Sequence, residues 1–108
     1  MNNLHLSPQA EEDLYESKTY IEEDLESPQA ALSTIAKITK TIRRLREHAL
    51  IGASLSAIAN IESDYRYLVS GNFLVFYRVV DKDIFIDRVL YGRRDYLRIL
   101  FTDETEDA

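Results

Sequence analysis

The sequence predicts an α+β fold in which a small antiparallel sheet packs against an N-terminal helical hairpin. Two observations support this prediction. Residues 65–90 contain three strand-length runs of alternating apolar residues, separated by short polar turns. Residues 8–49 contain two segments with apolar residues every three or four positions, each introduced by the same Ser-Pro-Gln-Ala tetrapeptide. The expected order of elements is therefore β-α-α-β-β-β.

The N-terminal part predicts one short strand and two helices. Asn3–Leu6 is a short apolar run of edge-strand length. Ser7 is a favoured N-cap and Pro8 suits the first helical position, so a helix is expected from here to about Glu26. A second helix is expected from Ser27-Pro28. The apolar stripes are Ala10, Leu14, Ser17, Ile21 and Leu25 in the first helix, and Leu32, Ile35, Ile38, Ile42, Leu45 and Ala49 in the second.

The C-terminal part predicts a meander of three strands. Gly71-Asn72 provides the positive φ that a tight hairpin needs, and an Asp-Lys-Asp triplet supplies the second reversal. The run Phe73–Val80 is apolar on both faces except at Arg78, so it is expected to be the central strand. Residues 52–59 are too poor in bulky side chains for the core and predict a loop.

The length of 108 residues suits one domain, expected over residues 1–101, with a short helix at 94–101 and an acidic, frayed tail at 102–108. The chain has no cysteine, which excludes disulfide scaffolds and thiolate metal sites. His5 and His48 are isolated, so neither a metal nor a cofactor is expected. No run approaches the roughly 18 apolar residues of a membrane span, and the N-terminus lacks a secretory pattern. We expect a cytoplasmic protein without a membrane partner.

The net charge of −6 is unevenly distributed along the chain. Residues 1–30 contain eight acids and one base, whereas residues 31–60 contain five bases and one acid. An acidic protein lacks the long-range attraction to polyanions that a basic nuclease exploits, although a local basic patch can still meet phosphate. RNA is therefore the less favoured main partner.

Two motifs carry a resemblance to a known family. Tyr65–Val79, with the letters YRYLVSGNFLVFYRV, and Arg88–Asp95, with the letters RVLYGRRD, together resemble the C-terminal half of the RelE/ParE superfamily of toxin–antitoxin toxins. The similarity is closest to ParE-like (plasmid stabilisation) members. It implies a small growth-inhibiting toxin that is neutralised by a cognate antitoxin. RelE-like members act on ribosome-bound mRNA, and ParE-like members act on DNA gyrase.

A nuclease of this superfamily needs cations that converge on the cleaved phosphate and an acid for the leaving oxygen. Leucine stands at positions 68 and 74, where nuclease members carry cations, so the resemblance favours a toxin that acts by binding over an enzyme. If the toxin acts by binding, it needs no catalytic residue, and we assign none. The candidates that the resemblance offers for a nuclease site are Arg66, Arg94, Tyr91 and Tyr96.

We therefore expect a ParE-like toxin that binds a target such as DNA gyrase. A cationic lip around the end of the last strand is the expected target-binding surface, formed by Arg88, Arg93, Arg94 and Arg98 with Tyr91 beside them. The expected antitoxin-binding residues are apolar edge positions, namely Tyr67, Phe85 and Leu97.

Three alternatives remain open at this point. The chain could be a RelE-like ribosome-dependent mRNA interferase. It could also be a degenerate member that acts only as a corepressor with its antitoxin. For Arg78 and Arg88, the alternative to a contact with a target is a simple ion pair with Asp87 or Asp64.

Overall fold

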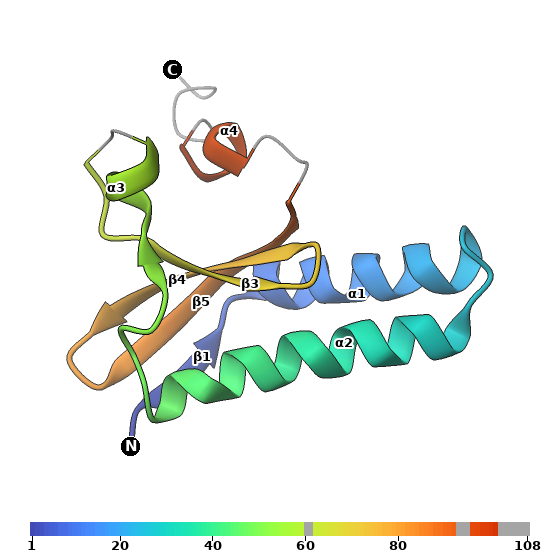
Figure 1. Ribbon diagram of the computed structural model, residues 1–108, viewed down its shortest axis with the longest axis horizontal. Coiled ribbons are helices and arrows are strands. Elements are labelled where there is room, and N and C mark those ends of the chain that lie inside the picture. Colours follow the sequence, from blue (N-terminus) through green and yellow to red (C-terminus); the bar gives the residue numbers. More distant parts are fainter. Residues whose placement is uncertain (60–61, 93–95, 102–108) are drawn as a thin grey trace.

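The computed structural model describes residues 1–59, 62–92 and 96–101 (Figure 1). Its strands are β1 (Asn3–Leu6), β2 (Ala53–Ser54), β3 (Arg66–Ser70), β4 (Phe73–Val80) and β5 (Asp83–Tyr91). Its helices are α1 (Pro8–Glu23), α2 (Pro28–Arg43), α3 (Leu55–Ala59) and α4 (Tyr96–Phe101), with a 3₁₀ turn η1 (Arg44–Arg46) after α2. The α+β class, the helical hairpin and the meander are confirmed. The predicted acidic tail lies outside the described residues.

The sheet has five strands in the order β1-β5-β4-β3-β2. Strand β4 is central, as its apolar sequence predicted, and it pairs antiparallel with β3 and β5. The prediction of a purely antiparallel sheet was wrong in one respect, because β1 pairs parallel to β5, with Asn3 beside Asp83 and Leu6 beside Ile86. A parallel pair needs a long crossover connection, and here two helices and the meander separate the two strands in the chain.

Both helices begin at the predicted residues, but fewer residues of their predicted apolar stripes are buried than the sequence indicated. Ser7 accepts a hydrogen bond from the Ala10 amide at 2.9 Å, and Ser27 caps α2 in the same way. Helix α1 ends at Glu23 instead of about Glu26, because the chain must reverse before the second Ser-Pro cap. Leu25 and Leu32 flank this reversal and are 58% and 62% exposed, so they do not belong to the core. No helix among the described residues is long and apolar enough to cross a bilayer.

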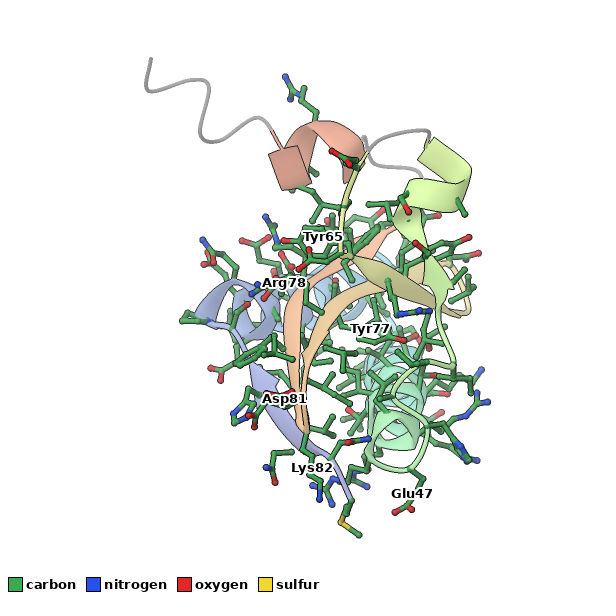
Figure 2. The ribbon with its side chains drawn as sticks, turned by 90° about the vertical axis from the view of Figure 1, so that its left-hand side faces the viewer. Glu47, Tyr65, Tyr77, Arg78, Asp81 and Lys82 are labelled. Carbon is green, nitrogen blue, oxygen red and sulfur yellow. The ribbon has the colours of Figure 1, made fainter. Side chains whose placement is uncertain are left out.

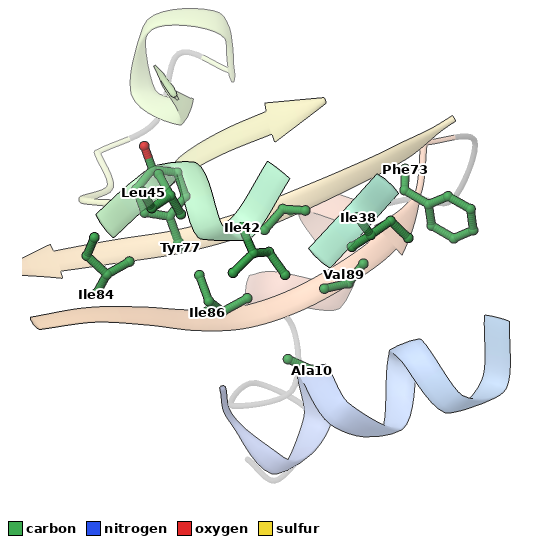
Figure 3. Packing of buried hydrophobic residues seen from close by; sticks show 10 residues of the cluster. Ala10, Ile38, Ile42, Leu45, Phe73, Tyr77, Ile84, Ile86 and Val89 are labelled. Atoms are coloured by element: carbon green, nitrogen blue, oxygen red, sulfur yellow. The ribbon is translucent and has the colours of Figure 1, made fainter. Parts of the chain in front are cut away.

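The main core lies between the hairpin and the sheet (Figure 3). Helix α2 and η1 supply Ile38, Ile42 and Leu45, which pack on β4 and β5, and α1 adds Ala10. Since a fully buried aliphatic side chain contributes about 1.5–3 kcal/mol, this contact fixes α2 and η1 firmly on the sheet. The strand residues of the cluster are Phe73, Val75, Tyr77, Ile84, Ile86 and Val89.

The opposite face of the sheet carries a second, smaller cluster. Leu55, Phe76 and Leu90 are its buried members, and Ile99 and Leu100 of α4 pack against them. The prediction of a loop over residues 52–59 was therefore wrong. Strand β2 pairs with β3, and Leu55 of α3 is fully buried. Two bulky residues, Leu55 and Ile58, among small ones gave too weak a local signal. The burial of Leu55 comes from strands that are distant in the sequence.

Tyr77 anchors the segment that leads from the helices to β2. Its hydroxyl accepts a hydrogen bond from the Gly52 amide at 2.9 Å and donates one to the Ala49 carbonyl at 2.9 Å. A Cβ at position 52 would lie 2.6 Å from both the Tyr77 hydroxyl and the Tyr67 carbonyl, so only glycine fits there. Figure 2 shows Tyr77 projecting to the side opposite Arg78.

Candidate functional site

An ion pair holds the N-terminal half of α1 against the edge of β5. The Asp13 carboxylate accepts hydrogen bonds from Nε and Nη2 of Arg88 at 2.8 and 2.9 Å. It also accepts one from the Val89 amide at 2.9 Å. Strand β1 ends at Leu6, opposite Ile86, so Asp13 takes the place that a continued strand would have as hydrogen-bond partner of β5. The Asp13 side chain is 6% exposed and that of Arg88 is 21% exposed.

A β-bulge places a second ion pair next to the first. The register of β4 and β5 shifts between Phe76, opposite Arg88, and Tyr77, opposite Ile86, which leaves Asp87 as the extra residue. Arg78 donates to Asp87 from Nε at 2.7 Å. One of the pairings considered from the sequence, Arg78 with Asp87, is thereby confirmed, whereas Arg88 pairs with Asp13.

Tyr65 completes this polar group on the same side as Arg78 (Figure 2). Burial, together with the negative charge of Asp87, raises the pKa of Tyr65 to about 12. The phenol therefore stays protonated at physiological pH. It can donate a hydrogen bond but cannot act as a base or a nucleophile.

These residues border a shallow hollow of about 240 Å³ between the start of α1, β5 and α4. Three of its polar side chains already have partners, because Ser7 donates to the Asp87 carbonyl at 2.8 Å, Arg88 is held by Asp13 and Asp87 is paired with Arg78. Its apolar wall comes from Ile99 and Leu100 of α4. Such a hollow suits a contact surface better than a site for acid–base chemistry. Within the described parts of the chain, no three His, Asp or Glu residues converge as metal ligands.

The described candidates for a nuclease site lie apart. Arg66 is opposite Tyr77, whereas Tyr91 is opposite Phe73, four residues farther along β4. At about 3.3 Å per residue this separates them by about 13 Å along the sheet. The Arg66 guanidinium donates to the Gly52 carbonyl at 2.7 Å, so it supports the loop before β2. Position 94 and the side chain of residue 96 lie outside the described residues.

The described members of the cationic lip differ in their surroundings. Arg88 is turned to Asp13, while Arg98 is exposed on α4. Tyr91 is 38% exposed at the end of β5, and its ring packs edge-on against Phe73 with centroids 5.6 Å apart. Residues 93 and 94 lie outside the described residues. Of the four arginines, Arg88 therefore has a structural contact that its sequence position did not predict.

The described antitoxin candidates share one face of the sheet, but neither is at an edge. Tyr67 lies between β2 and β4, and its ring centroid is 6.4 Å from that of Phe76. Phe85 lies between β1 and β4, stacks on His5 at 5.0 Å and has the Arg78 guanidinium 5.7 Å from its ring centre. Both are half-buried. The expectation of edge positions was wrong because β1 and β2 occupy the edges. The side chain of Leu97 lies outside the described residues.

The sequence contains one signal for the ion pair, in the position of Asp13. Asp13 lies three residues after Ala10 and four before Ser17, directly on the apolar stripe of α1. A carboxylate on a buried stripe requires a charged or hydrogen-bonding partner. Its partner, Arg88, is 75 residues away, so the sequence could indicate that a partner exists without identifying it.

Comparisons with known proteins agree with this architecture. The sequence profile of the family described as ParE toxin of type II toxin-antitoxin system, parDE, matches residues 4–96. The chain is similar to a solved structure titled "Chromosomal ParDE TA system from P. aeruginosa", with 25% identity, a TM-score of 0.69, and coverage of 82% of this chain and 94% of that one. It shares its fold with YafQ from E. coli strain BL21(DE3), with 17% identity, a TM-score of 0.56, and coverage of 94% and 99%. No curated protein sequence matches the chain.

Proposed function

The chain belongs to the ParE toxin family of type II toxin–antitoxin systems, and we propose that it inhibits growth by binding DNA gyrase and is neutralised by a cognate antitoxin. The family profile covers most of the chain, from residue 4 to residue 96. The similar structure from P. aeruginosa is titled as a ParDE toxin–antitoxin system, which supports an antitoxin partner. Gyrase is the target that the resemblance of the sequence to ParE-like members implies.

The observation that best supports binding over catalysis is the separation of the described nuclease candidates. A general acid must come within about 3 Å of the atom it protonates, directly or through one water. Arg66 and Tyr91 lie about 13 Å apart along the sheet, and Arg66 is held by the Gly52 carbonyl. Leu68 and Leu74 belong to the two apolar clusters, where the nuclease branch would need cations. A protein surface is therefore the better-supported ligand.

We place the target contact at the end of β5 and on α4. Arg93, Arg94 and Arg98 supply the positive charge of this surface, and Tyr91 supplies an aromatic anchor that is 38% exposed. Arg88 has a different part in the proposal. Since its guanidinium is paired with Asp13, Arg88 positions the end of β5 and does not itself contact the target.

We place the antitoxin contact on the sheet face that carries Tyr67 and Phe85, together with Leu97 of α4. Aromatic side chains in a half-buried setting are typical anchors for a partner segment. Gyrase and a co-encoded antitoxin both meet the toxin in the cytoplasm, so the proposal assigns the protein to that compartment.

The proposal as a whole is tested by induced expression in growing cells. Expression of the chain alone should arrest growth, and co-expression of the neighbouring open reading frame should restore growth and yield a co-purifying complex. High yield of the folded chain without a partner, with growth unchanged, contradicts the proposal.

A further inference from the structure

Among the described residues, a group of exposed cations without ion-pair partners lies away from the proposed target surface, on the outer face of α2 and η1. Five cations lie there, and all five are exposed: Lys37, Lys40, Arg43, Arg44 and Arg46. In the part of the chain that the structure describes, ion pairs form between His5 and Asp83, Lys18 and Glu22, Arg78 and Asp87, and Arg88 and Asp13. None of these pairs includes a cation of α2 or η1. We refer to these five residues as the α2 basic face.

The α2 basic face is held rigidly and at regular spacing. Lys37, Lys40 and Arg44 follow one another by three and four residues, so they lie on one side of the helix. The opposite side buries Ile38 and Ile42 in the main core. From residue 37 to residue 46 the array spans about 14 Å at 1.5 Å per residue.

The local backbone accounts for only part of this charge, because Lys40 and Arg43 lie in the last turn of α2 but Lys37 does not. Cations near a helix C-terminus can stabilise the last carbonyls, but Asn2 already provides hydrogen bonds there. Its side chain donates to the Leu45 and Arg46 carbonyls at 3.1 Å each, and its amide donates to the Arg46 carbonyl at 2.9 Å. Lys37 lies almost two turns before the end of α2, beyond the range of that effect.

The composition of the face selects among polyanionic partners. Segment 28–46 contains no aromatic residue. Single-stranded nucleic acid is bound by stacking of its bases on aromatic side chains, so a single strand is disfavoured as the partner. Protein interfaces use aromatic anchors and contain few lysines, so a protein is disfavoured as well. The row formed by Lys37, Lys40 and Arg44 on one side of a rigid helix offers cations to the phosphates along one strand of a duplex. At 3.4 Å of axis per phosphate, about 14 Å of helix faces about four phosphates.

We propose that the α2 basic face binds the phosphate backbone of duplex DNA, without sequence preference. This inference goes beyond the proposed function and does not depend on it. If gyrase is the target, the duplex is the one that gyrase holds. The acids of α1 and the net charge of −6 keep the affinity low, so the contact acts as a second attachment beside a protein target.

Fluorescence anisotropy with a labelled 16-base-pair duplex of arbitrary sequence tests this binding. The full chain, made by cell-free synthesis, is titrated between 20 and 150 mM KCl. About four contacts predict a slope of log K against log salt near −3.6. Lys37→Gln with Lys40→Gln should reduce the magnitude of the slope by about 1.8 and weaken binding roughly tenfold or more at 50 mM salt. Lys37→Arg with Lys40→Arg should bind like the wild type.

The matched control removes the same charge elsewhere, with Lys18→Gln and Lys82→Gln, and should leave the slope unchanged. Circular dichroism confirms that each variant is folded, as expected for exposed charges. The proposal is overturned by equal losses in both double variants, by no binding at 200 µM protein in 20 mM KCl, or by a single strand or poly-glutamate binding as tightly as the duplex. The last result would identify an acidic protein as the partner. Neither gyrase nor an antitoxin is present, so failure here leaves the proposed function untouched.

Discussion

The Asp13 carboxylate accepts two hydrogen bonds from the Arg88 guanidinium, at 2.8 and 2.9 Å, and a third from the Val89 amide. This one carboxylate thus connects α1 to the strand that leads to the proposed target surface. Because β1 stops at Leu6, no other described strand pairs with this side of β5 beyond Ile86, where Asp13 binds the Val89 amide. The orientation of the hairpin relative to the end of β5 depends on it.

Asp13→Ala should therefore be strongly destabilising. Removing one partner of a buried ion pair leaves an uncompensated charge and typically costs about 3–5 kcal/mol. Urea unfolding of Asp13→Ala should show a loss of this size in the free energy of unfolding. Asp24→Ala, at an exposed position, should change it by less than about 0.5 kcal/mol. Equal effects of the two substitutions would show that the ion pair contributes nothing.

Tyr77→Phe should be destabilising although it removes only one oxygen. The Gly52 amide and the Ala49 carbonyl lose their shared partner in a buried place, and each unsatisfied group costs about 1–3 kcal/mol. Thermal unfolding should show the loss, while Tyr15→Phe, on a ring that is 70% exposed, serves as control. A Tyr77→Phe protein as stable as the control would mean that the hydroxyl does not anchor this segment.

Tyr65 should make stability depend on alkaline pH. Its pKa is about 12 in the folded protein and about 10 in the unfolded chain. Between these values the unfolded chain binds fewer protons, so stability is fully present below pH 10 and falls as pH rises towards 12. Unfolding at a series of pH values should show a smaller fall for Tyr65→Phe than for the wild type, with Tyr15→Phe as the control for losing one chromophore. Identical pH profiles for Tyr65→Phe and the wild type would contradict the assignment.

Local sequence signals predicted the parts of the fold that depend on local physics. Ser7 and Ser27 cap their helices, and Gly71 has the expected positive φ of 58°. The parallel pairing of β1, the burial of Leu55 and the Asp13–Arg88 pair could not be predicted in the same way. Each depends on which distant strand comes to lie beside the residue, and no local spacing contains that information. The α2 basic face was visible as a charge excess, but only the structure shows that its cations are exposed and unpaired among the described residues.

The purified toxin should not cut mRNA on translating ribosomes. Leu68 and Leu74 contribute to apolar clusters, and the Arg66 guanidinium is bound to the Gly52 carbonyl. The described residues therefore lack converging cations that could stabilise the charged transition state of phosphodiester cleavage. Primer extension on a translated message checks this expectation. Codon-spaced cleavage that is lost in Arg94→Ala and in Arg66→Ala, with both variants shown to be folded, would support a RelE-like interferase instead.

The central claim, that the toxin acts by binding DNA gyrase, is tested most directly by a supercoiling assay with purified gyrase and toxin. We predict that micromolar toxin inhibits supercoiling and accumulates a cleaved gyrase–DNA complex. Arg93→Ala with Arg94→Ala should relieve both effects without unfolding the protein, since exposed charges contribute little stability. Lys18→Ala with Lys82→Ala, which removes the same charge elsewhere, should inhibit like the wild type. Full supercoiling activity and no trapped complex, with a protein that is folded and arrests growth in cells, would contradict the claim and leave another target to be found.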